Sequence, residues 1–195
     1  QHDIERATPG YTLFTPLGMY KTYLINMTGE VVHLWNLPND VGNYAYLLEN
    51  GNLLVAIRTE EGPQGLPAKG GHLMEMDWNG EIVWEHVDHA QHHDFRRCPN
   101  GNTVYLGWEL LEKETQTKVP GGMVGQEHPD GIYADYIREV DPKGNTIWEW
   151  HAATDLDMNR FPLNPTVGRM EFAHANTIFP CNNGDFIINW RYNHT

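Results

Sequence analysis

The sequence lacks the features that mark several large classes of protein. It contains no run of about 18 apolar residues, so we expect no transmembrane helix. Lysine and arginine number only 13 against 26 aspartates and glutamates, which gives a formal net charge of −13. This shortage of positive charge argues against a nucleic-acid partner, because phosphate binding needs a basic face. Helical periodicity is almost absent, and no glycine-rich phosphate loop or Gly-x-Ser-x-Gly elbow occurs.

Two short repeats are present instead, and they alternate along the chain. The first is a polar turn with glycine followed by a strand that contains tryptophan, and it covers residues 27–35, 78–86 and 142–150. The second is an Asn-Gly or Asn-Asn-Gly turn within residues 49–54, 99–104 and 182–187. Both are strong hairpin signals. Alternating hairpin types at this spacing are typical of β-propeller blades.

The repeats predict an all-β protein in which paired strands follow one another. We expect the strands at 22–26, 30–35, 44–48, 53–58, 72–77, 81–86, 92–98, 103–109, 135–141, 145–151, 174–179 and 185–191. One helical turn is expected around 154–160, and the long connections 59–71, 110–134 and 152–173 are either lids over a site or plain surface loops.

These strands predict a partial β-propeller domain over 1–195, with a half blade at 20–36, full blades at 44–86 and 92–151, and a half blade at 174–191. About three blades cannot close a ring, since propellers have about four to eight. The expectation is therefore a fragment, one chain of a split propeller, or a protomer whose copies close the ring. A second chain or further copies would then be the partners.

The two cysteines, Cys98 and Cys181, each lie three residues before the turn glycine of their repeat. They would occupy equivalent positions in neighbouring blades, which fan apart from the axis. Because a disulfide needs Cα atoms within about 7 Å, we expect two buried free thiols.

The eleven histidines are the main candidates for chemistry. His92, His93 and Asp94 begin one innermost strand, and His174 with Asn176 begins the next at the same repeat position. Alternation along a strand would place His92 with Asp94, and His174 with Asn176, on one face. We expect these side chains to line a shared funnel, to which Arg191 adds a positive charge. Such a funnel suits an oxyanion, although the same residues could only satisfy one another.

A metal site is the competing interpretation. Its ligands would be imidazoles from His92, His93, His174 and His128, the residue types that bind zinc and similar ions. No compact ligand spacing occurs, so only the fold could bring these side chains together.

The order of these motifs resembles the arylsulfotransferase (aryl-sulfate sulfotransferase) family, over the N-terminal half of its propeller. The similar stretches are 24–35, 46–54, 70–84, 92–102, 139–150 and 174–191. The closest fit is His174-Ala175-Asn176-Thr177-Ile178, with Asn189-Trp190-Arg191 behind it.

The resemblance implies a six-bladed propeller, periplasmic or secreted, that moves a sulfuryl group from a phenolic sulfate ester to a phenol. No cofactor is implied. By position, His92, His174 and Arg191 would be catalytic, and His93, Asp94 and Asn176 would bind substrate. The family uses a transiently sulfated histidine from a later blade, so we expect that residue on a missing segment or a partner chain.

Two other functions remain open. A propeller of this kind could run metal-dependent or lyase chemistry in its histidine funnel, or it could be a non-enzymatic scaffold, because fold does not fix function.

Overall fold

The computed structural model describes residue 3 and residues 5–193, and it divides into two compact units. The first unit is Gln1–Glu61 with Gly70–His89, and the second is Gly62–Lys69 with Ala90–Thr195. Strands in antiparallel sheets dominate, so the predicted all-β class is confirmed. Residues 1, 2, 4, 194 and 195 of the predicted 1–195 domain lie outside the described part. None of the helices in that part has the length and apolarity that crossing a bilayer requires.

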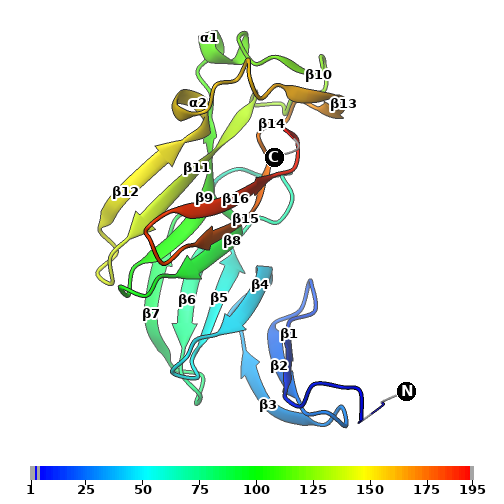
Figure 1. The fold of residues 1–195 in the computed structure, drawn as a ribbon, viewed down its shortest axis with the longest axis vertical. Coiled ribbons are helices and arrows are strands. Elements are labelled where there is room, and N and C mark those ends of the chain that lie inside the picture. The colour runs from blue at the N-terminus through cyan, green and yellow to red at the C-terminus, as the bar shows by residue number, and fades with distance from the viewer. Residues whose placement is uncertain (1–2, 4, 194–195) are drawn as a thin grey trace. The chain divides into compact units, whose positions relative to one another are not determined.

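The first unit contains two antiparallel sheets (Figure 1). The strands of the smaller sheet are β1 (Thr12–Phe14), β2 (Lys21–Ile25) and β3 (Val31–Asn36). The strands of the larger sheet, each paired with the next, are β4 (Val41–Leu47), β5 (Leu53–Arg58), β6 (Gly71–Met76) and β7 (Ile82–Val87). The apolar run of β5 is buried, and Trp35 of β3 packs in the same core cluster. The indole N–H of Trp35 donates to the carbonyl of Asp77 over 2.9 Å, which satisfies its polar atom.

The second unit repeats the four-stranded arrangement and adds to it (Figure 1). Its main sheet has the order β12-β11-β9-β8, made of β8 (Gln91–Arg97), β9 (Thr103–Leu110), β11 (Tyr133–Val140) and β12 (Thr146–His151). A hairpin of β15 (Ala175–Pro180) and β16 (Phe186–Trp190) follows. The short strand β14 (Glu171–Phe172) pairs in parallel with the start of β11. The remaining elements are β10 (Gly121–Met123), β13 (Leu163–Gly168), α1 (Lys113–Gln116) and α2 (Ala152–Asp155).

In each copy of the first repeat, the turn is stabilised by one Asp or Asn side chain and one glycine. Asp77 Oδ1 accepts the backbone N–H groups of Asn79 and Glu81 over 2.8 and 2.9 Å. Gly80 follows with φ +86°, a left-handed conformation that glycine adopts at little cost. Asp141 and Asn26 make the equivalent bonds in the other two copies. The turn chemistry read from the sequence is therefore confirmed in all three copies.

All the predicted strands are present, with ends that differ by a few residues at most. The strands β1, β10 and β14 were not predicted because they have only two or three residues, and β13 was not predicted because its sequence contains proline and lacks an alternating pattern. The helical turn expected around 154–160 lies earlier, at Ala152–Asp155. Both cysteines are free, with Cys98 buried and Cys181 half-buried.

Replacing Gly80 by alanine should lower the free energy of unfolding by about 1 kcal/mol, because a Cβ strains left-handed backbone. No heavy atom lies within 4 Å of the place that this Cβ would occupy, so the effect isolates the backbone. Gly80→Asn should cost less, since asparagine tolerates this conformation. Urea unfolding of both variants provides the check, and equal losses would contradict the explanation.

Candidate functional site

The backbone at the start of β8 is irregular, and this irregularity positions two histidines. In the pairing of β8 with β9, the register shifts between His92 and Phe95, so His93 and Asp94 form a bulge. His93 has φ +46°, and its N–H donates to the carbonyl of Ala68 over 2.9 Å. This bulge interrupts the regular alternation from which His92 and Asp94 were expected to share one strand face, so that expectation stays a prediction.

The backbone at His174, the second histidine segment, also has positive φ angles, as at His93. Ala173 and His174 have φ +82° and +56°, and with Ala68 and His93 they are the described non-glycine residues at positive φ. Such conformations cost about 1–3 kcal/mol each and cluster at functional sites. All four lie at or beside the histidines, which marks this region as the candidate site of the second unit.

His92 is fully buried between an aromatic ring and a carboxylate. Its ring stacks on the indole of Trp108 at a centroid distance of 4.1 Å. Its Nε2 lies 3.2 Å from Asp135 Oδ1, and its Nδ1 lies 2.8 Å from Nδ1 of His93. One proton must lie between those two Nδ1 atoms, so one imidazole donates and the other accepts.

His174 is held by a different carboxylate. It is 1% exposed, and its Nδ1 lies 2.9 Å from Oε1 of Glu171. Its ring stacks on Tyr192 at 4.3 Å and meets the ring of His93 edge to face at 5.0 Å. Its Nε2 is buried and has no hydrogen-bond partner. A buried nitrogen without a partner is unusual in a folded protein and points to a role with a ligand.

The pKa values of the two buried carboxylates, Asp135 and Glu171, are shifted in opposite directions. Burial, together with the charge of Glu171, raises the pKa of Asp135 well above its usual range. Burial by itself would also raise the pKa of Glu171, but hydrogen bonds from His174 and Trp108 and the nearby imidazoles outweigh it and lower that pKa. Burial therefore disfavours the ionised form of Asp135, whereas the donors around Glu171 favour its ionised form.

His93 is held as a neutral imidazole. Burial and the neighbouring His92 and His174 lower its pKa to about 3, and the charge of Arg191 acts in the same direction. At neutral pH the imidazole of His93 therefore carries no net charge.

The other predicted site residues lie around this cluster or away from it. Asp94 accepts the N–H groups of Phe95 and Ile178 over 2.8 and 2.9 Å, and so it fixes backbone. Asn176 donates to Asn189 over 3.3 Å, with no contact to the histidines among its described bonds.

Arg191 is exposed, and its guanidinium lies 5.8 Å from the ring of Tyr192. His128 belongs to the loop before β11, where both ring nitrogens bond to backbone: Nε2 to the carbonyl of Gln64 and Nδ1 to the N–H of Asp130. His128 is therefore not part of the cluster.

The alternative metal site is not assembled. Within residue 3 and residues 5–193, no group of three or more His, Cys, Asp or Glu side chains has the arrangement that holds a metal ion. The four histidines of that hypothesis are divided, with His128 in its own loop and the others bonded to carboxylates or to one another.

Sequence reasoning missed four residues of the cluster: Glu171, Asp135, Trp108 and Tyr192. Tyr192 directly follows the predicted Arg191, and Glu171 precedes His174 by three residues, so proximity in sequence was the one available signal. Trp108 and Asp135 lie on strands whose neighbours only the fold determines.

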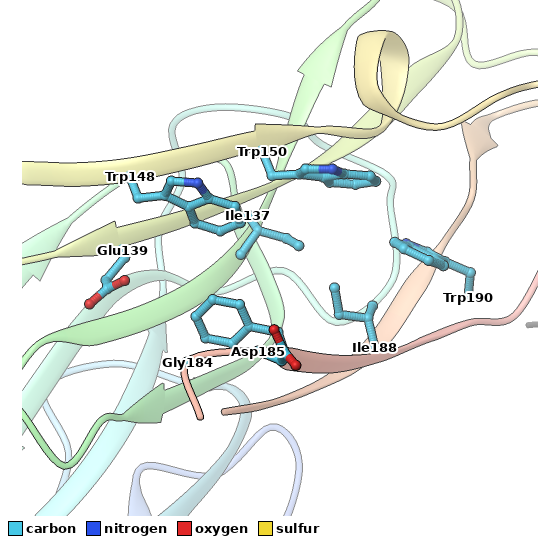
Figure 2. Close-up of a pocket in the computed structure, with 9 residues that line it drawn as sticks. Ile137, Glu139, Trp148, Trp150, Gly184, Asp185, Ile188 and Trp190 are labelled. Atoms are coloured by element: carbon cyan, nitrogen blue, oxygen red, sulfur yellow. The ribbon is translucent and has the colours of Figure 1, made fainter. Parts of the chain in front are cut away.

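A groove of about 590 Å³ lies elsewhere in the second unit. Figure 2 shows Trp148 and Trp150 of β12 on one side and Ile188 and Trp190 of β16 on the other. Trp150 stacks on Trp190 at 5.5 Å, and Trp148 stacks on Phe186 at 5.6 Å. The groove therefore separates the four-stranded sheet from the hairpin that follows it.

Comparison with known proteins adds little. No protein-family model matches the chain, and no curated protein matches it. It is similar to the crystal structure of a protein of unknown function from Bacteroides caccae, with 14% identity over 93% of this chain and a TM-score of 0.37. This chain spans 65% of that protein's length. The resemblance to arylsulfotransferases therefore stays a prediction.

The depressed pKa of His93 predicts acid sensitivity. The unfolded chain takes up a proton on this histidine below about pH 6.5, but the folded chain does so only near pH 3, so the free energy of unfolding should fall as the pH falls through this window. His93→Asn, which tolerates positive φ, should flatten this slope in urea unfolding between about pH 4 and 7. A variant with the wild-type slope would show that His93 titrates normally.

Proposed function

We propose that this chain supplies the sulfuryl-binding part of an arylsulfotransferase-type site, which moves a sulfuryl group from a phenolic sulfate ester to a phenol. The supporting observation is that His92, His93 and His174, from two equivalent positions of the repeat, converge in one buried cluster where Nε2 of His174 has no partner. The motif order of the sequence agrees with this function.

Sulfuryl transfer between phenols requires charge stabilisation and proton transfer. As the sulfur–oxygen bond of the donor ester breaks, its electron pair stays on the departing phenolic oxygen, which gains negative charge, while the sulfuryl oxygens keep the negative charge of the ester. Imidazole N–H groups stabilise such charge in a buried site, and Arg191 adds a nearby positive charge. Nε2 of His174 accepts the proton of the incoming phenol, a step that requires the cluster to open locally because this nitrogen is buried. The histidine that carries the sulfuryl group in between is assigned to another segment or a partner chain.

We propose further that the four-stranded sheets are blades of a six-bladed propeller. In each full sheet the turn of the second repeat is tied to the third strand, with Asn52 bonded to Glu75 and Asn102 bonded to Glu139. In the β15–β16 hairpin the corresponding residue is Asp185, and among the described residues β16 pairs only with β15. The aromatic groove would then receive the third strand of that blade.

The partner that supplies these strands would be a further segment of the protein, a second chain or another copy. Its third strand should place a hydrogen-bond donor opposite Asp185, where the full sheets place Glu75 and Glu139. The same function implies a periplasmic or secreted location.

A lyase that abstracts a proton from its substrate is the second candidate. The observation that favours it is the carboxylate–imidazole pair of Glu171 and His174, which is the arrangement of a general base. The substrate of this reaction must have an acidic C–H bond, and it does not have to be a sulfate ester.

Turnover of an aryl sulfate with a phenol acceptor tests the function, using the protein with any chain that copurifies with it. His174→Ala should lower kcat/KM about 100-fold or more, since it removes an acid–base group. Arg191→Ala should also reduce turnover strongly while the exposed position leaves folding intact. His151→Ala, a half-buried histidine bonded to Glu109, is the matched control and should stay near wild type. Wild-type protein that binds aryl sulfates but turns none over, even with its partner, would overturn the sulfotransferase function.

Native mass spectrometry should show this chain bound to a second polypeptide or to further copies, because β16 pairs only with β15 among the described residues and so leaves one strand edge open. Asp185→Lys should weaken that association if a donor lies opposite. A monomer at all concentrations would contradict the assembly.

A further inference from the structure

Glu171 is buried beside His174, and both of its oxygens are occupied. Oε2 accepts the indole N–H of Trp108 over 2.7 Å, and Oε1 lies 2.9 Å from Nδ1 of His174. The carboxylate is 1% exposed. Pairing of β14 with β11, which aligns Glu171 with Tyr133, fixes its backbone. The left-handed turn at Ala173 and His174 then directs the imidazole back onto the carboxylate.

The two contacts of Glu171 determine where the proton lies. The indole N–H of Trp108 can only donate, so the carboxylate must accept at Oε2. The indole N–H favours the ionised carboxylate, which can only accept at Oε1 as well. Nδ1 of His174 must then carry the proton of the shared bond. The opposite tautomer would set a lone pair of Nδ1 against a carboxylate oxygen and bury an N–H at Nε2 without an acceptor.

We propose that Glu171, anchored by Trp108, is the positioning residue that fixes His174 as the Nδ1–H tautomer and leaves the lone pair of Nε2 as the reactive one. The other described neighbours of the ring do not favour the opposite tautomer, because they contact it through aromatic rings: Tyr192 stacks on one face at 4.3 Å, and His93 meets it edge to face.

The catalytic consequence rests on the proposed function, but the tautomer does not. When a phenol donates its proton, its O–H bond breaks and an Nε2–H bond forms on His174. The resulting imidazolium stays paired with the ionised Glu171, which stabilises the charge. The same pair would serve a lyase, with a C–H bond breaking in place of the O–H bond.

The tautomer can be measured without any substrate. In full-length protein with 15N-labelled histidine, long-range 1H–15N spectra near pH 7.5 distinguish protonated from unprotonated ring nitrogens, and His174→Gln identifies the signals. We expect a protonated Nδ1 and an unprotonated Nε2. A protonated Nε2 in the neutral ring would overturn the proposal, and this wild-type result stands even if a variant fails to fold.

Glu171→Gln offers the sharper test. The amide must turn its oxygen toward the N–H of Trp108, so its NH2 group faces Nδ1 of His174, and the tautomer should reverse to Nε2–H. In the Glu171→Gln, Trp108→Phe double variant the indole N–H is gone, the amide can turn back, and Nδ1–H should reappear in part. Trp108→Phe alone keeps a ring over His92 and should retain the wild-type tautomer. An unchanged tautomer in folded Glu171→Gln would reduce Glu171 to a structural tie between β14 and β15.

Activity separates this inference from the function on which its consequence depends. If His174 is the Nδ1–H tautomer but no sulfuryl transfer occurs, only the proposed function fails. If transfer occurs and Glu171→Gln reverses the tautomer, turnover should fall about 100-fold or more, with its pH profile shifted, because Nε2 then lacks a lone pair. Turnover that is unaffected by a reversed tautomer would remove Glu171 from any positioning role.

Discussion

Two buried carboxylates of the four-stranded sheet hold the start of the next hairpin through its backbone. Asp135 on β11 accepts the N–H of Ala175 over 2.8 Å, and Asp94 on β8 accepts the N–H of Ile178 over 2.9 Å. Since both donors are main-chain groups of β15, these bonds place the strand itself rather than one side chain. His174 directly precedes β15, so its approach to the other two imidazoles follows from this attachment.

The attachment must also outweigh backbone strain. His93, His174 and their alanine neighbours have positive φ, and each costs about 1–3 kcal/mol. Close packing next to His174 offsets this strain, because Ala175 belongs to one buried cluster with Leu106 and Ile178 across β9 and β15. A rigid, closely packed core is what allows a strained segment to persist.

The two buried carboxylates of the cluster have pKa values shifted in opposite directions, which suits acid–base chemistry. Asp135, which loses solvation and faces a second negative group, has its pKa raised, whereas Glu171 is stabilised as an anion by two donors. Pairs of groups whose environments push their pKa values apart are a recurring property of acid–base sites. His93, whose pKa is lowered to about 3, stays neutral at neutral pH, so it can donate or accept a proton.

The sequence by itself determined the elements of this protein. Turn glycines such as Gly80, with an aspartate three residues earlier, specify hairpins locally, and the repeat located the strands and the two histidine segments. Only the tertiary structure decided what those histidines touch. The bulge at His93 depends on how β8 meets β9, and the bond from Trp108 to Glu171 joins residues 63 positions apart. Turn and strand preferences act between near neighbours, whereas the partners of a buried side chain depend on which sheets pack together.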